Sequence, residues 1–314
     1  MDLNNIEVQG GGDNNEKNGE FLNINPQGTC KYYEINEFQE KSKDFSTFSN
    51  FSTLSLNVRS LKNKWTEFNE LLGELNHENF CFSIIGIQEV WDIPSLFNTN
   101  IPSYKPFIYK LRDKDQNSIR SNCGGGIGLW VHEQFDVEVL EDLSYFKEKV
   151  FESLFIKVKT SKNSFKIVGN VYRAPSANIN EFNNILKTIL ETISKDTFLS
   201  KAEEVVLMGD YNINLIQYEN HPQTLRYLDI LLTNNFMPHI TLPSRITNTS
   251  STLIDHIHSN SKQGSFISGI IYSCISDHMP IFNIGHTSKV GKSSKKENIQ
   301  IRKFGPKNTS LFKD

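Results

Sequence analysis

Short apolar runs are the feature that most constrains how this chain can fold. They recur between residues 51 and 286, and polar residues or glycine separate them. Runs of about four to eight apolar or alternating residues are typical of β-strands. Strands are therefore predicted over 53–58, 82–88, 125–131, 150–158, 165–172 and 205–208, with three more around the sequences "TLIDHI", "SGIIYS" and "MPIFNI".

Three other stretches carry the spacing of amphipathic helices. In residues 62–75 the apolar side chains fall on one helical face, and residues 179–194 and 224–235 show the same periodicity. Strands and helices alternate in places, but no helix is predicted between the strands of residues 125–172. This mixture favours an α/β (α+β) fold, with mixed sheets and outer helices, over a purely parallel doubly wound sheet.

Composition divides the 314 residues into four segments. Residues 1–29 are rich in Asn, Gly and charge and are expected to be disordered. Residues 30–50 form a lead-in segment, and residues 51–286 form one domain without a repeat or an internal linker. Residues 287–314 hold eight lysines and arginines against two acidic residues. Such a basic tail can bind phosphates, act as a nuclear address or serve as a linker, and charge alone favours the linker.

The four cysteines and the N-terminal sequence bear on location. The cysteines form no Cys-x-x-Cys pair, so a reducing compartment is expected. No apolar run approaches membrane-spanning length, and the first residues have no signal-peptide pattern. We therefore expect a soluble intracellular protein.

Polar residues stand at the ends of several predicted strands. In "VVLMGDYNINL" (205–215), four apolar residues lead through Gly209 to a carboxylate and two amides at every second position. Strand ends at one edge of a layered fold bring distant residues together and hold them rigidly. One site is therefore predicted from Asn57, Glu89, Tyr172, Asp210, Asn212, Asp255, Asp277 and His278.

The residue types in this set indicate phosphoester chemistry. Carboxylates and amides without cysteine or a paired histidine favour Mg²⁺ or Mn²⁺ over zinc. No evident nucleophilic serine or cysteine accompanies them. A hard cation beside an Asp–His couple is the equipment for metal-assisted hydrolysis of a phosphoester, in which charge develops on phosphate oxygens.

The order of these motifs resembles a known family. "LNVRSL", "IQEVW", "VYRAPS", "GDYNINL", "STLIDHI" and "ISDHMPIF" are similar to the motif set of the endonuclease/exonuclease/phosphatase superfamily. Within it, "GGGIGLWV" and "LPSRITNTSSTLIDHI" most resemble the apurinic-type endonuclease domain of non-LTR (LINE-like) retrotransposons. The resemblance spans roughly residues 30 to 310. It implies a four-layer sandwich of two face-to-face mixed β-sheets flanked by helices, and an endonuclease that nicks DNA to leave a 3′-hydroxyl priming reverse transcription.

The resemblance also implies a metal site and a DNA-binding surface. Glu89 matches the family's principal metal carboxylate, Asn57 matches the amide beside it, and Asp277 matches an aspartate near the metal. The implied cofactor is Mg²⁺, with Mn²⁺ as a substitute, and the implied partner is double-stranded DNA, which would place the protein in the nucleus when it acts. The expected DNA-binding residues are Arg59, Arg173 and Thr252.

Five further residues are implied to be catalytic. Asp210 matches the carboxylate that orients or deprotonates the attacking water, Asn212 matches an amide on the phosphate, and Tyr172 matches a tyrosine that contacts it. Asp255 matches the partner that fixes the imidazole of His278. Whether His278 acts as a base or as a charge stabiliser stays open.

Each residue, taken alone, has an ordinary structural interpretation. Asn57 could simply end a strand, Glu89 could be solvated, and Tyr172 could be a core or rim aromatic. His256 and His258 are expected to be surface or packing residues instead of metal ligands. "GGG" at 124–126 is better read as a tight turn than as a phosphate loop, because no Lys-Ser/Thr follows it. Chance is a poor explanation for all six motifs in the family's order.

Alternatives to the retrotransposon endonuclease remain open at this point. The same fold and metal serve abasic-site repair nucleases and phosphoinositide phosphatases, and a domesticated copy could bind DNA without cleaving it. The chain holds no reverse transcriptase, which we expect in the full-length parent element. A hairpin is also predicted over residues 258–274, beside the site, with its loop "SKQG" (261–264) influencing where a nick falls.

Overall fold

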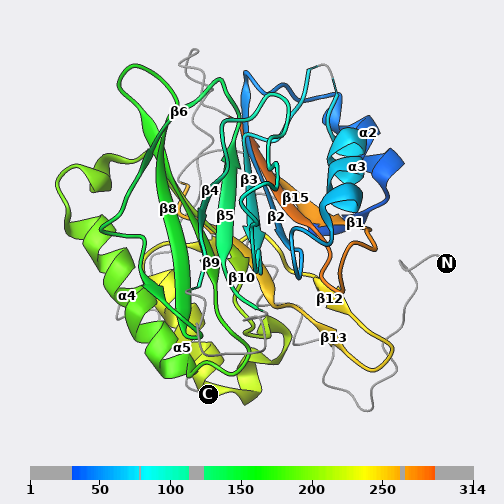
Figure 1. Cartoon of the computed structure of the whole chain (residues 1–314). Coiled ribbons are helices and arrows are strands. Elements are labelled where there is room, and N and C mark those ends of the chain that lie inside the picture. Colours follow the sequence, from blue (N-terminus) through cyan, green and yellow to red (C-terminus); the bar gives the residue numbers. More distant parts are fainter. Residues whose placement is uncertain (1–29, 78, 113–123, 262–265, 287–314) are drawn as a thin grey trace, which may run out of the picture.

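The computed structural model describes residues 30–77, 79–112, 124–261 and 266–286 (Figure 1). The segments predicted as a disordered N-terminus (1–29) and a basic tail (287–314) lie outside the described residues. No helix in the described part of the chain is long and apolar enough to span a bilayer.

The first of two large sheets is mixed and has seven strands, in the order β1-β15-β16-β2-β3-β5-β4. Neighbours β1 and β15, and β2 and β3, are parallel, and the other pairs are antiparallel. The strands are β1 (Cys30–Tyr33), β2 (Asn50–Asn57), β3 (Ile84–Gln88), β4 (Ile108–Lys110), β5 (Ile127–Val131), β15 (Phe266–Ile271) and β16 (Ile281–His286).

The second large sheet is also mixed, in the order β11-β14-β10-β9-β8-β6, and β7 pairs with β8 outside this path. Only β9 and β10 run parallel. Its strands are β6 (Asp136–Val139), β7 (Phe146–Lys147), β8 (Phe151–Lys159), β9 (Phe165–Tyr172), β10 (Glu204–Asp210), β11 (Met237–Pro238) and β14 (Asp255–Ser259).

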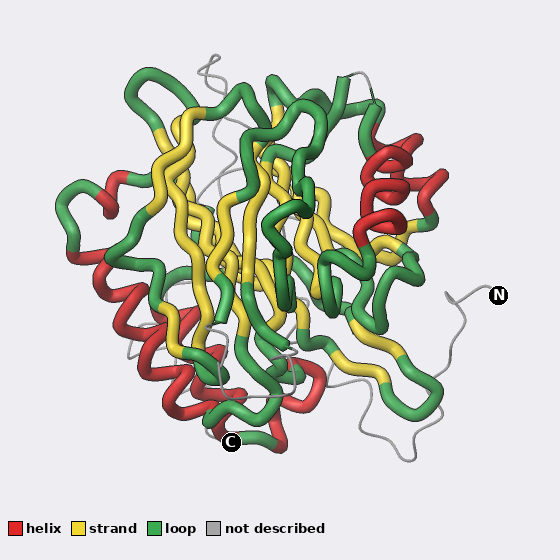
Figure 2. Tube along the Cα trace, in the orientation of Figure 1, coloured by secondary structure: helices red, strands yellow, loops and turns green. Residues whose placement is uncertain are grey.

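Helices cover the outer faces of both sheets, which gives four layers (Figure 2). On the outer side of the first sheet lie α2 (Ile35–Ser42) and α3 (Trp65–Leu75). On the outer side of the second sheet lie α4 (Ile179–Lys195) and α5 (Pro222–Thr233), with two 3₁₀ turns, η2 (Leu199–Lys201) and η3 (Leu215–Asn220). The predicted four-layer sandwich is confirmed.

Two hydrophobic cores hold the layers together. One lies between the first sheet and its helices and includes Phe68 of α3 and Trp130 of β5, whose rings are stacked. The other joins the two sheets and extends to α4, whose buried Phe182 packs on Phe151 of β8. The Asn178 side chain caps α4 by accepting hydrogen bonds from the backbone N–H groups of Asn180 and Glu181, as N-cap residues do. Burial on both faces explains why the central strands have nearly continuous apolar sequences.

Two segments differ from the sequence-based interpretation. The lead-in segment, 30–50, contributes the edge strand β1 and the helix α2, so it belongs to the same unit as residues 51–286. The hairpin predicted over 258–274 is wrong, because β14 pairs with β10 in the second sheet while β15 pairs with β16 in the first. Most of its proposed loop, residues 262–264, lies outside the described residues.

A different hairpin stands next to these strands. It consists of β12 (Arg245–Ile246) and β13 (Ser251–Thr252), with a four-residue turn at 247–250. It projects from the body of the sandwich in Figure 1. Local sequence cannot reveal which sheet a short strand will join, and that choice decides where the hairpin forms.

Candidate active site

Three strand ends of the second sheet place the central part of the site. Asp210 is the last residue of β10, and it lies opposite Asp255, the first residue of β14. On its other side the register pairs Asp210 with Tyr172, the last residue of β9. Polar residues at adjoining strand ends therefore meet, as the sequence predicts.

Gly209 allows β10 to approach β9 at this point. Its φ angle is +143°, and a Cβ atom here would lie 1.9 Å from the carbonyl oxygen of Val171. No side chain can be accommodated at that distance, since the obstacle is backbone. The glycine in "GDYN" is thus required for the position of Asp210.

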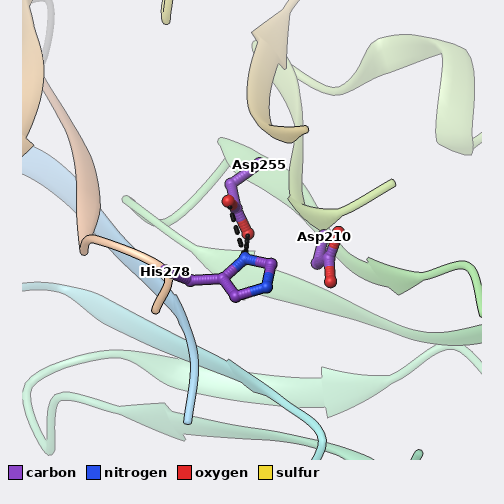
Figure 3. Close-up of side chains that lie close together, drawn as sticks. All are labelled: Asp210, Asp255 and His278. Atoms are coloured by element: carbon purple, nitrogen blue, oxygen red, sulfur yellow. Dashed lines mark hydrogen bonds and ion pairs between the residues drawn. The ribbon is translucent and has the colours of Figure 1, made fainter. Parts of the chain in front are cut away.

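Asp255 and His278 form a buried pair (Figure 3). Nδ1 of His278 lies 3.0 Å and 2.9 Å from the two carboxylate oxygens of Asp255. The hydroxyl of Ser244 donates to Asp255 Oδ2 at 2.6 Å. The carboxylate holds Nδ1, so Nε2 is left facing the side on which Asp210 lies.

The pKa values of Asp210 and His278 are both raised above their ordinary values. Burial, followed by the charge of Asp255, raises the pKa of Asp210 to about 7. Burial disfavours a charged His278, but the charge of Asp255 and the hydrogen bond to it outweigh this effect and raise the pKa of His278 to about 9. At neutral pH the imidazole is protonated, and Asp210 is balanced between its two forms.

Asn57 links the second sheet to the first. It is the last residue of β2, and its Nδ2 donates to Glu89 Oε1 at 2.9 Å and to Asp210 Oδ2 at 2.8 Å. Glu89 also accepts from the indole N–H of Trp91 at 3.0 Å and from the hydroxyl of Tyr172 at 3.3 Å. One amide therefore brings two carboxylates from different sheets side by side.

Asn212 is fixed next to Asp210. Its backbone N–H donates to Asp210 Oδ1 at 2.9 Å, and its Nδ2 donates to Asp210 Oδ2 at 3.0 Å and to the carbonyl oxygen of Arg173 at 2.7 Å. Its φ angle is +48°, in the left-handed region. This amide is held by its own short turn and needs no contact with the first sheet.

Backbone strain concentrates around these residues. Of the non-glycine residues with positive φ, five lie in or beside the site: Arg59 (46°), Ser60 (92°), Glu89 (53°), Trp91 (67°) and Asn212 (48°). Such conformations cost on the order of 1–3 kcal/mol each and persist where surrounding contacts enforce them. They are typical of functional sites, where a side chain must point in a required direction even if the backbone is strained.

Asp277 is held by two arginines. Arg59 Nη1 donates to its Oδ1 at 2.8 Å, and Arg245 Nε and Nη2 approach Oδ2 at 2.7 and 2.6 Å. Burial acts to raise the pKa of Asp277, but the hydrogen bonds from Arg245 and then Arg59 prevail and lower it. Both oxygens of this predicted metal ligand are thus engaged within the protein.

The predicted DNA-binding residues have unequal positions. Arg59 has a half-exposed side chain on Asp277. Arg173 is buried, and its guanidinium donates to the carbonyl oxygens of Ala174 and Pro175, so in this conformation it offers nothing to a DNA backbone. Thr252 is partly buried on β13 of the projecting hairpin.

Several site residues escaped the sequence interpretation. Ser244 holds Asp255, Trp91 holds Glu89, and Arg245 holds Asp277. "LPSRIT" and "IQEVW" contained them, but their function depends on pairings that only the fold creates. His256 and His258, in contrast, are buried packing residues that share the hydroxyl of Tyr227, in agreement with their predicted role.

The donor set fits a hard divalent cation. Single ligand atoms of Asp210, Asp255 and His278 all lie within 4.8 Å of one another. Because Asp255 and His278 are bound to each other, the better candidates are the carboxylates of Asp210 and Glu89, which Asn57 brings together. Oxygen ligands of this kind suit Mg²⁺ or Mn²⁺.

Comparison with known proteins decides the family. The model of the endonuclease/exonuclease/phosphatase family matches residues 54–278, more than two thirds of the chain. The chain belongs to this family. As a family member it has the fold of hydrolytic nucleases and phosphatases, and the matched range includes every predicted site residue. No curated protein is significantly similar to the chain in sequence.

Solved structures show the same family fold at low sequence identity. The AP endonuclease LMAP from Leishmania major is 12% identical, with a TM-score of 0.61 over 79% of this chain and 91% of that one. The endonuclease domain of TRAS1, a telomere-specific non-LTR retrotransposon, is 10% identical, with a TM-score of 0.53 over 76% and 98%. TDP2 from D. rerio, complexed with a single-strand DNA product, is 15% identical, with a TM-score of 0.52 over 76% and 100%.

Proposed function

We propose that the chain is a magnesium-dependent DNA endonuclease of retrotransposon origin, which hydrolyses a phosphodiester to leave a 3′-hydroxyl that primes reverse transcription. The observation that carries the proposal is the position of the protonated His278, fixed by Asp255, opposite Asp210. This arrangement brings a proton acceptor and a positive charge within 4.8 Å of each other.

Asp210 is the general base in this proposal. Its pKa of about 7 suits the removal of a proton from water at neutral pH. Asn57 and Asn212 orient its two oxygens. The phosphate of the substrate is negatively charged, and the carboxylates of the site repel it. A positive charge close to the phosphate is therefore needed.

His278 is the charge stabiliser. With a pKa of about 9 it already carries its proton at neutral pH, so it cannot accept one from water. Its Nε2–H can donate to a phosphate oxygen as negative charge develops there. Asp255 fixes the ring and compensates its charge.

Glu89, beside the amide of Asn57, is the residue that would hold the cation, which leaves Asp210 as the base. When bound, Mg²⁺ would supply Lewis-acid stabilisation of the phosphate oxygens and offset the charge of the two carboxylates. Tyr172 and Trp91 hold Glu89 in place for this role.

Incubation with supercoiled plasmid and Mg²⁺ tests the proposal. We expect conversion to the nicked circle, and a polymerase should extend the nick without prior phosphatase treatment because its end is a 3′-hydroxyl. Asp210→Asn should abolish nicking, whereas Asp229→Asn, on the exposed side of α5, is the matched control. Failure of the wild-type protein to nick, or 3′-phosphate ends, would refute the proposal.

Parallel substrates separate it from the alternatives. An abasic-site duplex and a phosphoinositide are offered under the same conditions. Faster turnover of either substrate than of intact plasmid would favour a repair nuclease or a lipid phosphatase. Binding of duplex DNA without hydrolysis of any substrate would favour the non-catalytic remnant.

A further inference from the structure

The group formed by Arg59, Asp277 and Arg245 lies on the outer side of the buried Asp255–His278 pair. Its side chains are 51%, 25% and 32% exposed, while those of His278 and Asp255 are 6% and 3% exposed. Arg59 follows Asn57 by two residues, and the backbone of Arg245 bridges to that of His278. The group therefore borders the site and is open to a large substrate.

The two arginines come from different parts of the sandwich. Arg59 follows β2 of the first sheet, and Arg245 belongs to β12 of the projecting hairpin. Both guanidiniums direct their hydrogen bonds to one carboxylate, with Arg59 on Oδ1 and Arg245 on Oδ2 of Asp277. Asp277 thus sets the spacing between two cations that the fold would otherwise leave independent.

Donor capacity remains on both arginines. A guanidinium has five N–H donors. Within the described residues, side-chain hydrogen bonds of Arg59 and Arg245 go only to Asp277, through Nη1 of Arg59 and through Nε and Nη2 of Arg245. The group carries two positive charges and one negative charge, so its net charge of about +1 matches one phosphodiester of a nucleic-acid backbone.

We propose that Arg59 and Arg245, spaced by Asp277, form a binding site for a DNA backbone phosphate that flanks the phosphate at which the strand is cut. The inference rests on the proposed function. It gives Asp277 a positioning role toward the two arginines. A tie that only anchored the hairpin would need Arg245 alone, whereas Arg59 joins the same carboxylate from a strained backbone conformation.

Binding of a fluorescent duplex oligonucleotide, followed by anisotropy in EDTA over a series of salt concentrations, tests the site without catalysis. Each phosphate contact contributes about 0.9 to the slope of log K against log salt. Arg59→Gln and Arg245→Gln should each weaken binding several-fold and lower the slope by about this amount. Arg226→Gln, an exposed position on α5, is the matched control. Arg245→Lys keeps the charge but loses the planar fork, and should retain the slope with reduced affinity.

Asp277→Ala separates positioning from simple charge. Removing a negative charge should tighten DNA binding, but loss of the spacer should weaken it, and we expect the weaker binding. Tighter binding by Asp277→Ala overturns the positioning role. Slopes for Arg59→Gln and Arg245→Gln equal to that of Arg226→Gln, in variants with unchanged melting temperature, overturn the phosphate site.

A small substrate distinguishes this inference from the proposed function. Hydrolysis of bis(p-nitrophenyl) phosphate with Mg²⁺ needs no flanking phosphate, so Arg59→Gln and Arg245→Gln should lose less of this activity than of plasmid nicking. A parallel loss on this substrate would place the arginines on the scissile group and overturn the inference. If wild-type protein hydrolyses neither this compound nor plasmid, the proposed function fails, while the anisotropy series still decides whether the arginines bind phosphate.

Discussion

Asp210 and Asp255 face each other across two antiparallel strands, and His278 binds Asp255 with the nitrogen that is turned away from Asp210. The two carboxylates have different functions because only Asp255 is paired with the His278 ring. Asp255 has the imidazolium, while Asp210 has amide donors from Asn57 and Asn212. The two carboxylates therefore differ in surroundings, and burial raises the pKa of Asp210 to about 7.

The first prediction concerns the Asp255–His278 pair as a unit. His278→Ala should remove most nicking activity, and Asp255→Asn a large part of it, because the ring loses its fixed orientation. The double variant should cost little beyond His278→Ala, since residues that act together are strongly non-additive. A double-mutant cycle on nicking rates, with circular dichroism to confirm folding, measures the coupling. Multiplicative losses would show that Asp255 acts independently.

The second prediction is the pH dependence of stability. The pKa of His278 rises from its ordinary 6.5 to about 9 in the fold, so folding favours the protonated ring. Its contribution to the free energy of unfolding should be fully present below pH 6.5 and should be lost as pH rises through 9. Urea titrations of wild type and His278→Asn in EDTA, from pH 6 to about 10, should give a difference that shrinks with pH. A difference that is constant over this window would exclude the raised pKa.

The third prediction concerns Glu89. Glu89→Ala should reduce plasmid nicking by at least about 10²–10³-fold while the protein stays folded, because a well-placed electrostatic group is lost without a packing defect. Glu70→Ala on the exposed side of α3 is the matched control. Activity within a few-fold of wild type for Glu89→Ala would remove this carboxylate from the metal site.

The fourth prediction concerns the β12–β13 hairpin. It projects from the sandwich, and its base adjoins His278 through Arg245. Under the proposed function, we expect its turn to contact DNA beside the cleaved bond. Replacing residues 247–250 with glycine and serine should redistribute nick positions on a plasmid more than it changes the total rate. Sequencing of nick ends provides the measurement. An identical pattern in both proteins would show that the turn does not read DNA.

Sequence alone could predict the strands that carry the site. The predicted strands that lead to Asn57, Glu89 and Asp210 are all present and buried. The approach of Asp255 and His278, which lie 23 residues apart, followed only from the family resemblance, because it depends on strands in two different sheets.

The pairings around Asp277 could not be predicted. The sequence shows three charged residues at distant positions, and nothing local selects Arg59 and Arg245 over other basic residues. The same limitation produced the wrong hairpin, because the sequence of a short strand such as β14 or β15 does not show which sheet it joins. Long-range pairing follows from how the sheets pack, which a linear pattern does not encode.

The site draws its residues from both sheets, and this has a consequence for how the protein loses function. Asn57 and Glu89 extend from one sheet, Asp210 from the other, and a single amide spans the junction. Sliding of the sheets by about 1 Å would break that bridge while leaving each sheet's own hydrogen bonds intact, and such misplacement can cost about 10² in rate. Under the proposed function, the nicking rate should therefore depend on the alignment of the two sheets. In a urea series it should decline ahead of the far-ultraviolet circular dichroism signal, and coincident loss would mean that the two sheets separate only when the whole fold melts.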